Sequence, residues 1–317
     1  MDPLMLLLQQ LGLTVGDVRQ DSKFTAVLSK ELEYVKARTY DIVYPQLKAR
    51  QLIPVSSEVD TGAETIAYKQ WDEFGIAQVL SNYADDLPLV DALAEEFTQK
   101  IVPLGLGYQY SIQDLRRSAM SGTRLDQRRA GACRRGVEWA IEEMAVAGDS
   151  NHGVTGFANN ANITLVSPTT GTWSTATGAQ MVADALKLEA AILVANKETF
   201  MPTTLALDIT TMSYFNKARI STTGDTHVTA KEAFLKSAMS VTEVVSWNKL
   251  SNRDAAGTGP RAVMYTKSPD VLTLEIPQEF EQFPPQMRNL SFLVPAHARC
   301  AGVIWYYPIG ASYMDGL

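Results

Sequence analysis

Residues 123–148 read TRLDQRRAGACRRGVEWAIEEMAVAG, and this stretch has the strongest helical periodicity in the chain. Its apolar or small residues recur at the spacing that places one stripe of a helix against a core: Leu125, Ala132, Cys133, Gly136, Val137, Ala140, Ile141 and Met144. Thr123 and Asp126 can form a capping box, and Gly148 is a suitable stop. At about 1.5 Å per residue the predicted helix is about 40 Å long, enough to serve as the spine of a domain.

The charges of this helix run against its dipole. Arginines occupy the first half and carboxylates the second: Arg124, Arg128 and Arg129 against Glu138, Glu142 and Glu143. Each misplaced terminal charge costs a few tenths to about 1 kcal/mol, so we expect groups outside the helix to have selected this order. Gly131 and Gly136 predict the close approach of another backbone, because glycine destabilises a helix interior by about 1 kcal/mol. A solvated arginine face is the equally open alternative.

The composition indicates a globular protein. A chain of 317 residues with 46% hydrophobic residues can bury one large core or two moderate ones. The net charge of −7 argues against a surface that grips nucleic acid tightly. Two cysteines, Cys133 and Cys300, make no disulfide framework and indicate a reducing compartment. The short apolar run near the N-terminus has neither the basic start of a signal peptide nor the length of a membrane span.

The remaining segments predict an α+β fold. Residues 1–30 predict a loosely held arm, and 51–55 (QLIPV) a short strand start. Alternation that is weak in TIAYKQW and clear at 104–110 predicts two strands with a long excursion between them. Later segments predict three helices, at 179–196, ITTMSYFNKAR and AKEAFLKSAM, and six strands, at 203–207, SVTEVVSW, RAVMYT, VLTLEI, NLSFLV and CAGVIWYY. The stretch 252–261 predicts a loop.

Two neighbouring stretches carry opposite charge. Residues 70–99 contain seven acids and no Lys, Arg or His, whereas residues 116–135 contain seven arginines and one acid. These blocks can fold onto each other within one chain. The excursion has little core of its own, however, so the basic block of another copy is a candidate partner. The predicted inter-subunit contact residues are Asp85, Asp86, Asp91, Glu95, Glu96, Arg116, Arg117, Arg128, Arg129, Arg134 and Arg135.

Motifs for chemistry are weak. There is no G-x-S-x-G elbow, and the histidines have no paired spacing for zinc. The stretch 149–160 resembles the start of a calcium loop, but Asn160 stands where a bidentate Glu is needed. Asp225 and His227 can be imagined as an acid–base pair, although no nucleophile is close in sequence. We therefore expect no catalytic residue, no cofactor and no metal site.

The order of these elements resembles the major capsid proteins of tailed bacteriophages. The most specific piece is RRAGACRRGVEWAIEEMAVAGDSNHGVTGFANN, residues 128–160. In that family and in the related encapsulin shells, the spine helix is followed by a Gly-rich turn and the signature G-[ILV]-x-G-[ILF]-x-N. Gly153, Val154, Gly156, Phe157 and Asn159 match this signature. The stretch ELEYVKARTYDIVYPQLKARQLIPV looks like an arm that enters the first strand.

The resemblance implies a tailed-phage major capsid fold. Its parts are an N-terminal arm (1–50), an extended-loop hairpin (51–110), a peripheral domain with the spine helix (111–178), an axial domain (179–260) and return strands (261–317) that complete the sheets. The short loose N-terminus implies that a scaffold comes from a separate protein. Some members crosslink a lysine of the extended loop, but no lysine stands between Lys69 and Lys100, so that chemistry is not expected here.

The function implied by the resemblance is structural and not enzymatic. Subunits of this family form hexamers and pentamers of an icosahedral shell that encloses double-stranded DNA. The implied protein partners are further copies of the chain and scaffolding, portal and cement proteins. Contact with the packaged DNA is implied to be weak and non-specific, and no membrane is involved. The implied place is the virion capsid, after synthesis in the host cytoplasm. Two alternatives stay open: an encapsulin-like compartment and a cytosolic α+β enzyme with an unrecognised site.

Overall fold

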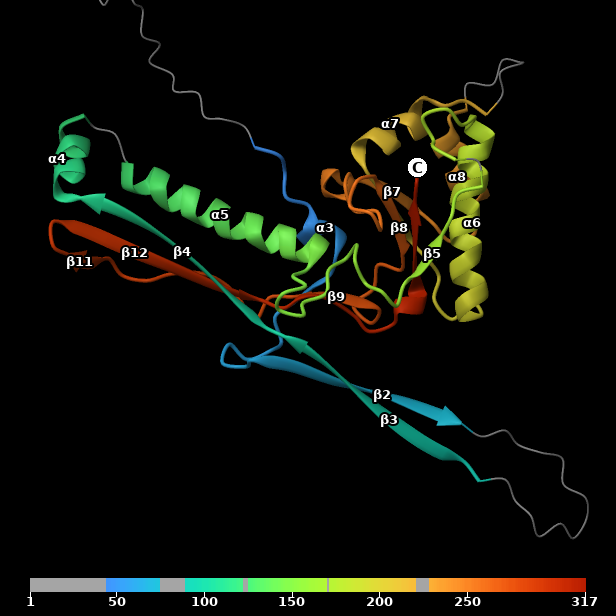
Figure 1. Ribbon diagram of the computed structural model, residues 1–317, viewed down its shortest axis with the longest axis horizontal. Coiled ribbons are helices and arrows are strands. Elements are labelled where there is room, and N and C mark those ends of the chain that lie inside the picture. Colours follow the sequence, from blue (N-terminus) through green and yellow to red (C-terminus); the bar gives the residue numbers. More distant parts are fainter. Residues whose placement is uncertain (1–43, 75–88, 122–124, 170, 221–227) are drawn as a thin grey trace, which may run out of the picture. The chain divides into compact units, whose positions relative to one another are not determined.

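The computed structural model describes residues 44–74, 89–121, 125–169, 171–220 and 228–317. The chain divides into two compact units, residues 1–46 and 47–317. The fold described below is that of the second unit (Figure 1). The predicted N-terminal arm therefore lies almost wholly outside the described residues.

Helices and strands are interspersed along the second unit (Figure 1). The helices are α3 (Ala49–Leu52), α4 (Ile112–Ser121), α5 (Leu125–Ala147), α6 (Gly178–Asn196), α7 (Ile209–Lys217), α8 (Ala230–Ser237) and the 3-10 turns η1 (Asn248–Leu250) and η2 (Pro308–Gly310). The strands are β1 (Val55–Ser56), β2 (Thr65–Phe74), β3 (Asp91–Lys100), β4 (Val102–Ser111), β5 (Thr164–Val166), β6 (Thr204–Leu207), β7 (Glu243–Ser246), β8 (Arg261–Tyr265), β9 (Leu272–Glu275), β10 (Gln278–Gln282), β11 (Gln286–Arg288), β12 (Ser291–Cys300), β13 (Gly302–Trp305) and β14 (Ala311–Asp315).

The long helix α5 packs along a sheet built on β12. Strand β12 pairs in antiparallel register with β4 over its full length, from Cys300 opposite Val102 to Ser291 opposite Ser111. On its other side it pairs with β10 and β11. Burial alternates along β12 because one face of the sheet is covered. Leu106 of β4 points at α5, where a β-carbon on Gly136 would meet its Cδ2 atom at 2.7 Å.

A glycine-rich turn closes the C-terminal end of α5. Gly148, with φ of +66°, takes the left-handed conformation that ends the helix. Phe157 N and Ala158 N donate to the carbonyls of Ala145 and Val146 at 2.8 and 2.9 Å, and Asn159 Nδ2 donates to the Ala147 carbonyl. A β-carbon on Gly156 would lie 2.4 Å from the Gly148 nitrogen, so only glycine fits there. The signature sequence therefore satisfies the last carbonyls of the spine helix.

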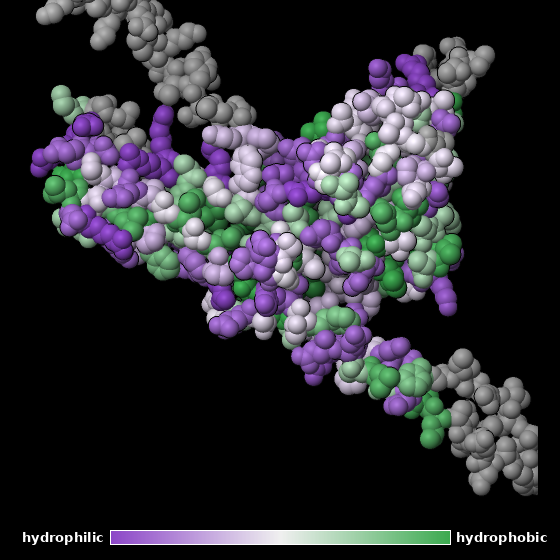
Figure 2. Space-filling model, in the orientation of Figure 1, coloured by the Kyte–Doolittle hydropathy of each residue, from purple (hydrophilic) through white to green (hydrophobic). Residues whose placement is uncertain are grey.

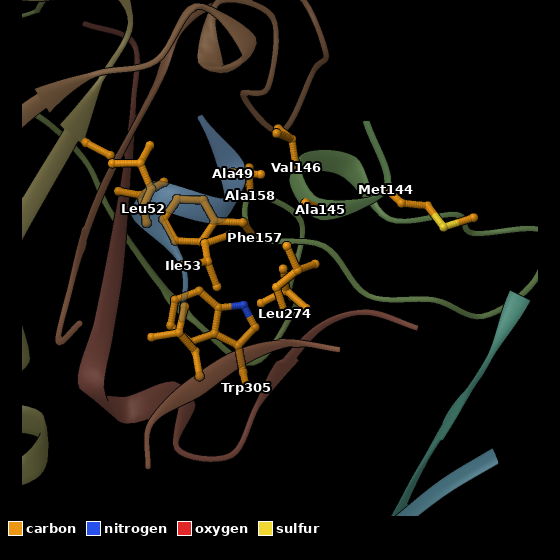
Figure 3. Packing of buried hydrophobic residues seen from close by; sticks show 14 of the residues in the cluster. Ala49, Leu52, Ile53, Met144, Ala145, Val146, Phe157, Ala158, Leu274 and Trp305 are labelled. Carbon is orange, nitrogen blue, oxygen red and sulfur yellow. The ribbon is translucent and has the colours of Figure 1, made fainter. Parts of the chain in front are cut away.

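The turn also delivers Phe157 to the centre of the larger core. Its ring lies 5.0 Å from Tyr265 and 5.6 Å from both Trp247 and Trp305, and it is fully buried. Figure 3 shows Phe157 among residues of α3, the end of α5 and β9. One short turn thus joins segments from 49 to 305 in a single cluster.

A second core lies between a five-stranded sheet and helices α6, α7 and α8. The sheet has the order β5-β14-β8-β6-β7. Helix α6 begins with a capping box from Thr177 and Gln180 and ends at Lys197, whose φ of 51° is left-handed. Its apolar face packs Met181, Ala185 and Leu188 into this core. The helix predicted over 179–196 is confirmed.

Three expectations for local structure need correction. Gln51 and Leu52, expected to start a strand, belong to α3, and the strand begins at Val55. Gly136 is approached by a side chain and not by a backbone. A β-carbon on Gly131 would meet no atom within 4 Å in the described part of the chain. The capping box of Thr123 and Asp126 falls outside what the structure describes.

Candidate functional site

The carboxylates in the second half of α5 have partners that are distant in sequence. Glu142 is buried, and its Oε1 accepts from Lys48 N at 3.0 Å and from Trp247 Nε1 at 2.7 Å. Its Oε2 accepts from Ala49 N at 2.9 Å. The carboxylate thereby caps the first turn of α3 and holds the segment of Trp247 at the same point.

The two neighbouring acids make ion pairs. Arg50 Nε lies 3.2 Å from Glu138 and its Nη1 lies 2.7 Å from Glu279 of β10. Glu143 binds Lys249 at 2.9 Å and also Arg253. Burial alone would raise the pKa of Glu143, but the hydrogen bonds from Lys249 and Arg253 outweigh it and hold the pKa below its usual range. These contacts confirm partners outside the helix for the three carboxylates in its second half.

The arginines of the basic block occupy two different settings. Arg129 is half-buried, donates from Nη1 to the Gln109 carbonyl at 2.7 Å, and lies 3.5 Å from Asp114. A hydrogen bond from the Ser111 backbone, followed by the charge of Arg129, lowers the pKa of Asp114. The other candidates of this block are exposed: Arg116 and Arg117 on α4, and Arg128, Arg134 and Arg135 on α5.

Three of the acidic candidates lie on β3. The pleat of the strand divides them, because alternate side chains point to opposite faces. Asp91 and Glu95 share one face, whereas Glu96 lies on the other, where it faces Lys69 at 3.9 Å across the hairpin. Asp85 and Asp86 lie outside the described residues. The acidic stretch is therefore not a single surface.

Strands β2 and β3 form a two-stranded ribbon whose distal half exposes large apolar side chains. Trp71 is 66% exposed, Leu93 61% and Phe74 49%. Figure 2 shows hydrophobic residues beside hydrophilic ones along this ribbon. The charge pattern did not predict this feature, although Trp71 and Phe74 within an acidic run were a visible signal. Exposed apolar area of this kind marks a contact surface.

The root of the ribbon is fixed to the rest of the unit. Gln99 Nε2 donates to the Ala301 carbonyl at 2.9 Å, and Arg299 Nη2 donates to the Ala63 carbonyl at 2.6 Å. The ring of Tyr68 stands edge-on to Tyr306 at 5.0 Å. A cavity of about 360 Å³ lies at this root, lined by neutral polar and aromatic side chains. The ribbon is thus anchored at one end and exposed at the other.

Potential metal ligands are not clustered in the part of the chain that the structure describes. There, no three side chains among His, Cys, Asp and Glu cluster as metal ligands. Both cysteines are buried, and burial raises the pKa of the Cys300 thiol to about 11. Asp225 and His227 lie outside the description. Of the helices that are described, none has the length and apolar character to cross a membrane.

Comparison with known proteins gives one family and a set of similar folds. The family model described as "Major capsid protein" matches residues 75–317. No curated protein matches the sequence. The capsid protein of Myoviridae phage XM1 superposes with a TM-score of 0.80 at 15% identity, over 91% of this chain and 98% of that one.

Two further structures have the same fold. The capsid of an empty GTA particle has a TM-score of 0.59 at 14% identity, with 92% of this chain and 97% of that chain covered. The virus-like particle from Pyrococcus furiosus has a TM-score of 0.54 at 11% identity, with 83% and 90% covered. These similarities confirm the predicted α+β fold of the tailed-phage capsid type.

Proposed function

Because the chain belongs to the major capsid protein family, we propose that it assembles into hexamers and pentamers of an icosahedral shell that encloses double-stranded DNA. The protein is structural and not an enzyme. We assign residues 1–50 to the N-terminal arm, 51–110 to the extended loop, 111–178 to the peripheral domain, 179–260 to the axial domain and 261–317 to the return strands. The shell is the virion capsid, and its subunits are made in the host cytoplasm.

The exposed distal half of the β2–β3 ribbon is the observation that carries this proposal. A ribbon of two strands is marginal in water unless one face packs on something. The apolar side chains of Trp71, Phe74 and Leu93 have little cover within the described subunit. A surface on another copy supplies the missing cover for the face that carries Phe74 and Leu93 together with Asp91 and Glu95. A patch that binds a different patch on the next copy builds rings where the rotation closes.

The basic face of α5 is the surface that we assign to receive the ribbon. Arg128 and Arg135 are seven residues apart, so they share one side of the helix, and Gly131 lies between them on that side. No atom of the described subunit lies close enough to require glycine at position 131. The space beside Gly131 leaves room for a second chain to approach the helix. Because exposed ion pairs contribute only about 0–1 kcal/mol each, apolar contact supplies the affinity and charge sets the partner and register.

The other partners follow from the same assignment. A scaffolding protein, a portal and a cement protein complete such a shell, and they would bind surfaces other than the ribbon. Contact with the packaged DNA is weak and non-specific, because the chain carries a net charge of −7. An encapsulin-like compartment remains the second candidate, and purified particles that hold a protein cargo and no nucleic acid would favour it.

Charge reversal on the ribbon tests the assignment. The double variant Asp91→Lys/Glu95→Lys should leave the subunit folded and raise the concentration needed for assembly by about tenfold, the equivalent of about 1.4 kcal/mol. Sedimentation of assembled particles gives this concentration, and circular dichroism checks the fold. Adding Arg128→Glu/Arg135→Glu should restore part of the assembly.

The matched control places the same change on the opposite face of the ribbon. Glu73→Lys/Glu96→Lys alters the net charge equally, but at side chains on the face away from Asp91 and Glu95. Assembly of this control should stay close to that of the unaltered protein. Equal impairment in both double variants would contradict the assignment of the charges to one face.

A further inference from the structure

The cavity at the root of the β2–β3 ribbon lies apart from the distal half of the ribbon, which we assign to the contact between subunits. Its volume of about 360 Å³ is at the lower end of the range of about 300–1,000 Å³ that is typical of ligand pockets. The ribbon forms one wall, and the chain after α5 and the chain around β13 form the other. A molecule bound there contacts both the ribbon and the body of the subunit.

Aromatic rings form the apolar part of the cavity wall. Tyr68 and Phe97, which pair across the ribbon, stack with their ring centroids 5.4 Å apart, and Tyr306 stands edge-on to Tyr68. Trp305 also lines the cavity. Tyr306 is held from behind, because its hydroxyl donates to Oε1 of the buried Glu275 at 3.4 Å. The aromatic wall is therefore formed before any ligand binds, which lowers the entropic cost of binding.

Side-chain amides form the polar part of the wall. Gln70 donates from Nε2 to the Tyr306 carbonyl, which leaves its Oε1 able to accept. Asn160 accepts at Oδ1 from Asn162 N at 2.8 Å, which leaves its Nδ2 able to donate. The amide of Asn162 is exposed beside them and can do both. The wall thus suits a ligand whose polar groups both donate and accept hydrogen bonds.

The cavity favours an uncharged ligand. None of the described residues that line it carries a charged side chain. Burial raises the pKa of Tyr68 and of Tyr306, so both phenols keep their protons at neutral pH. Phosphates and carboxylates are bound by Arg, Lys or helix N-termini, and metal ions by carboxylates, His or Cys. A purely apolar ligand, in turn, would leave the amides of the wall without hydrogen bonds.

We propose that this cavity binds a neutral mono- or disaccharide. A sugar ring has an apolar face of C–H groups and a rim of hydroxyls that donate and accept. The apolar face fits the aromatic wall, and the hydroxyls fit the amides of Gln70, Asn160 and Asn162. The inference does not rest on the proposed shell, because one subunit contains every group named here.

Titration of the full chain in its unassembled form tests the inference. The neutral probes are galactose, N-acetylglucosamine and maltose, and the charged probes are glucuronic acid and sialic acid. At least one neutral sugar should bind saturably, with a dissociation constant of about 1 mM or lower. The charged sugars should bind at least about tenfold more weakly, because the wall offers no cation. Isothermal titration calorimetry measures both constants.

Substitution Asn162→Ala places the bound sugar in the cavity. It removes one amide from an exposed position, so the subunit should fold, and the dissociation constant should rise about fivefold or more. Asn151→Ala is the matched control, since it makes the same change at an exposed asparagine that does not line the cavity. The control should bind the sugar as the unaltered chain does. Amide hydrogen exchange should slow in the presence of the sugar at residues 68–70 and 160–162.

Saturable binding of a neutral sugar that weakens in Asn162→Ala and not in Asn151→Ala supports the inference. No binding of any neutral probe up to about 20 mM overturns it, and so does tighter binding of a charged sugar. Equal weakening in the two variants also overturns it, because the sugar then binds elsewhere. Absence of sugar binding, together with a protein segment seen in the cavity in assembled particles, would give the cavity to a protein contact instead.

Discussion

Glu142 is the residue at which three distant segments meet. Its carboxylate accepts hydrogen bonds from the backbone of Lys48 and Ala49 and from the indole of Trp247, all within 3.0 Å. A buried carboxylate needs such donors, because an uncompensated buried charge is strongly destabilising. This side chain therefore couples the start of the described fold to α5 and to the segment before η1.

Substitution Glu142→Gln should destabilise the unassembled subunit by about 1–3 kcal/mol, because an amide has one acceptor oxygen and leaves a buried donor unsatisfied. Denaturant unfolding measures the loss. Glu143→Gln is the matched control: its side chain is 44% exposed, so its ion pairs should contribute no more than about 1 kcal/mol. Equal losses in the two variants would contradict the role given to Glu142.

The sequence predicted that partners outside the helix exist but not which residues they are. The order of charges along α5 can be read from the sequence, and the unfavourable interaction of these charges with the helix dipole involves only the helix itself. The partners, however, stand 94 residues before and 105 and 106 residues after the carboxylates they bind. Only the packing of the core brings them together.

At the scale of elements, the junction of α5 with the turn after it decides the fold. The turn satisfies the last carbonyls of the helix and places Phe157 in the core. Close backbone contact at Gly156 makes both possible. The signature quoted from the sequence is thus a physical requirement of this junction.

Gly156→Ala should prevent folding or destabilise the subunit by several kcal/mol, since its β-carbon would overlap backbone atoms of Ala147 and Gly148. Gly131→Ala provides the contrast: no described atom lies near its β-carbon, so the isolated subunit should gain up to about 1 kcal/mol. Thermal unfolding of both variants measures the difference. A neutral Gly156→Ala would contradict this account of the junction.

The elements that the sequence predicted well are those with a long period or a buried apolar run. Helices α5 and α6 and strands β8, β9, β12 and β13 fall where they were expected. Strands β10 and β11 were missed because they are short and largely exposed, with no apolar alternation. Residues 51–55 were misjudged because Glu142, far away in sequence, caps the short helix α3.

At the scale of the whole molecule, two cores bury their apolar side chains, whereas the β2–β3 ribbon leaves some of its own exposed. The cores around Phe157 and around α6 bury their apolar residues within the described subunit. The distal part of β2 and β3 leaves Trp71 and Leu93 exposed. Counting charges predicted one acidic surface, and the pleat divides it, because alternate residues of a strand point to opposite faces.

A cryo-electron microscopy map of assembled particles tests the central claim most directly. The subunit is expressed with a co-produced scaffold where it does not assemble alone. We predict a closed icosahedral shell of hexamers and pentamers in which each β2–β3 ribbon lies on a neighbouring copy, so that the face with Phe74 and Leu93 is covered. Particles whose ribbons pack on their own subunit, or a protein that stays monomeric under every condition, would contradict the account.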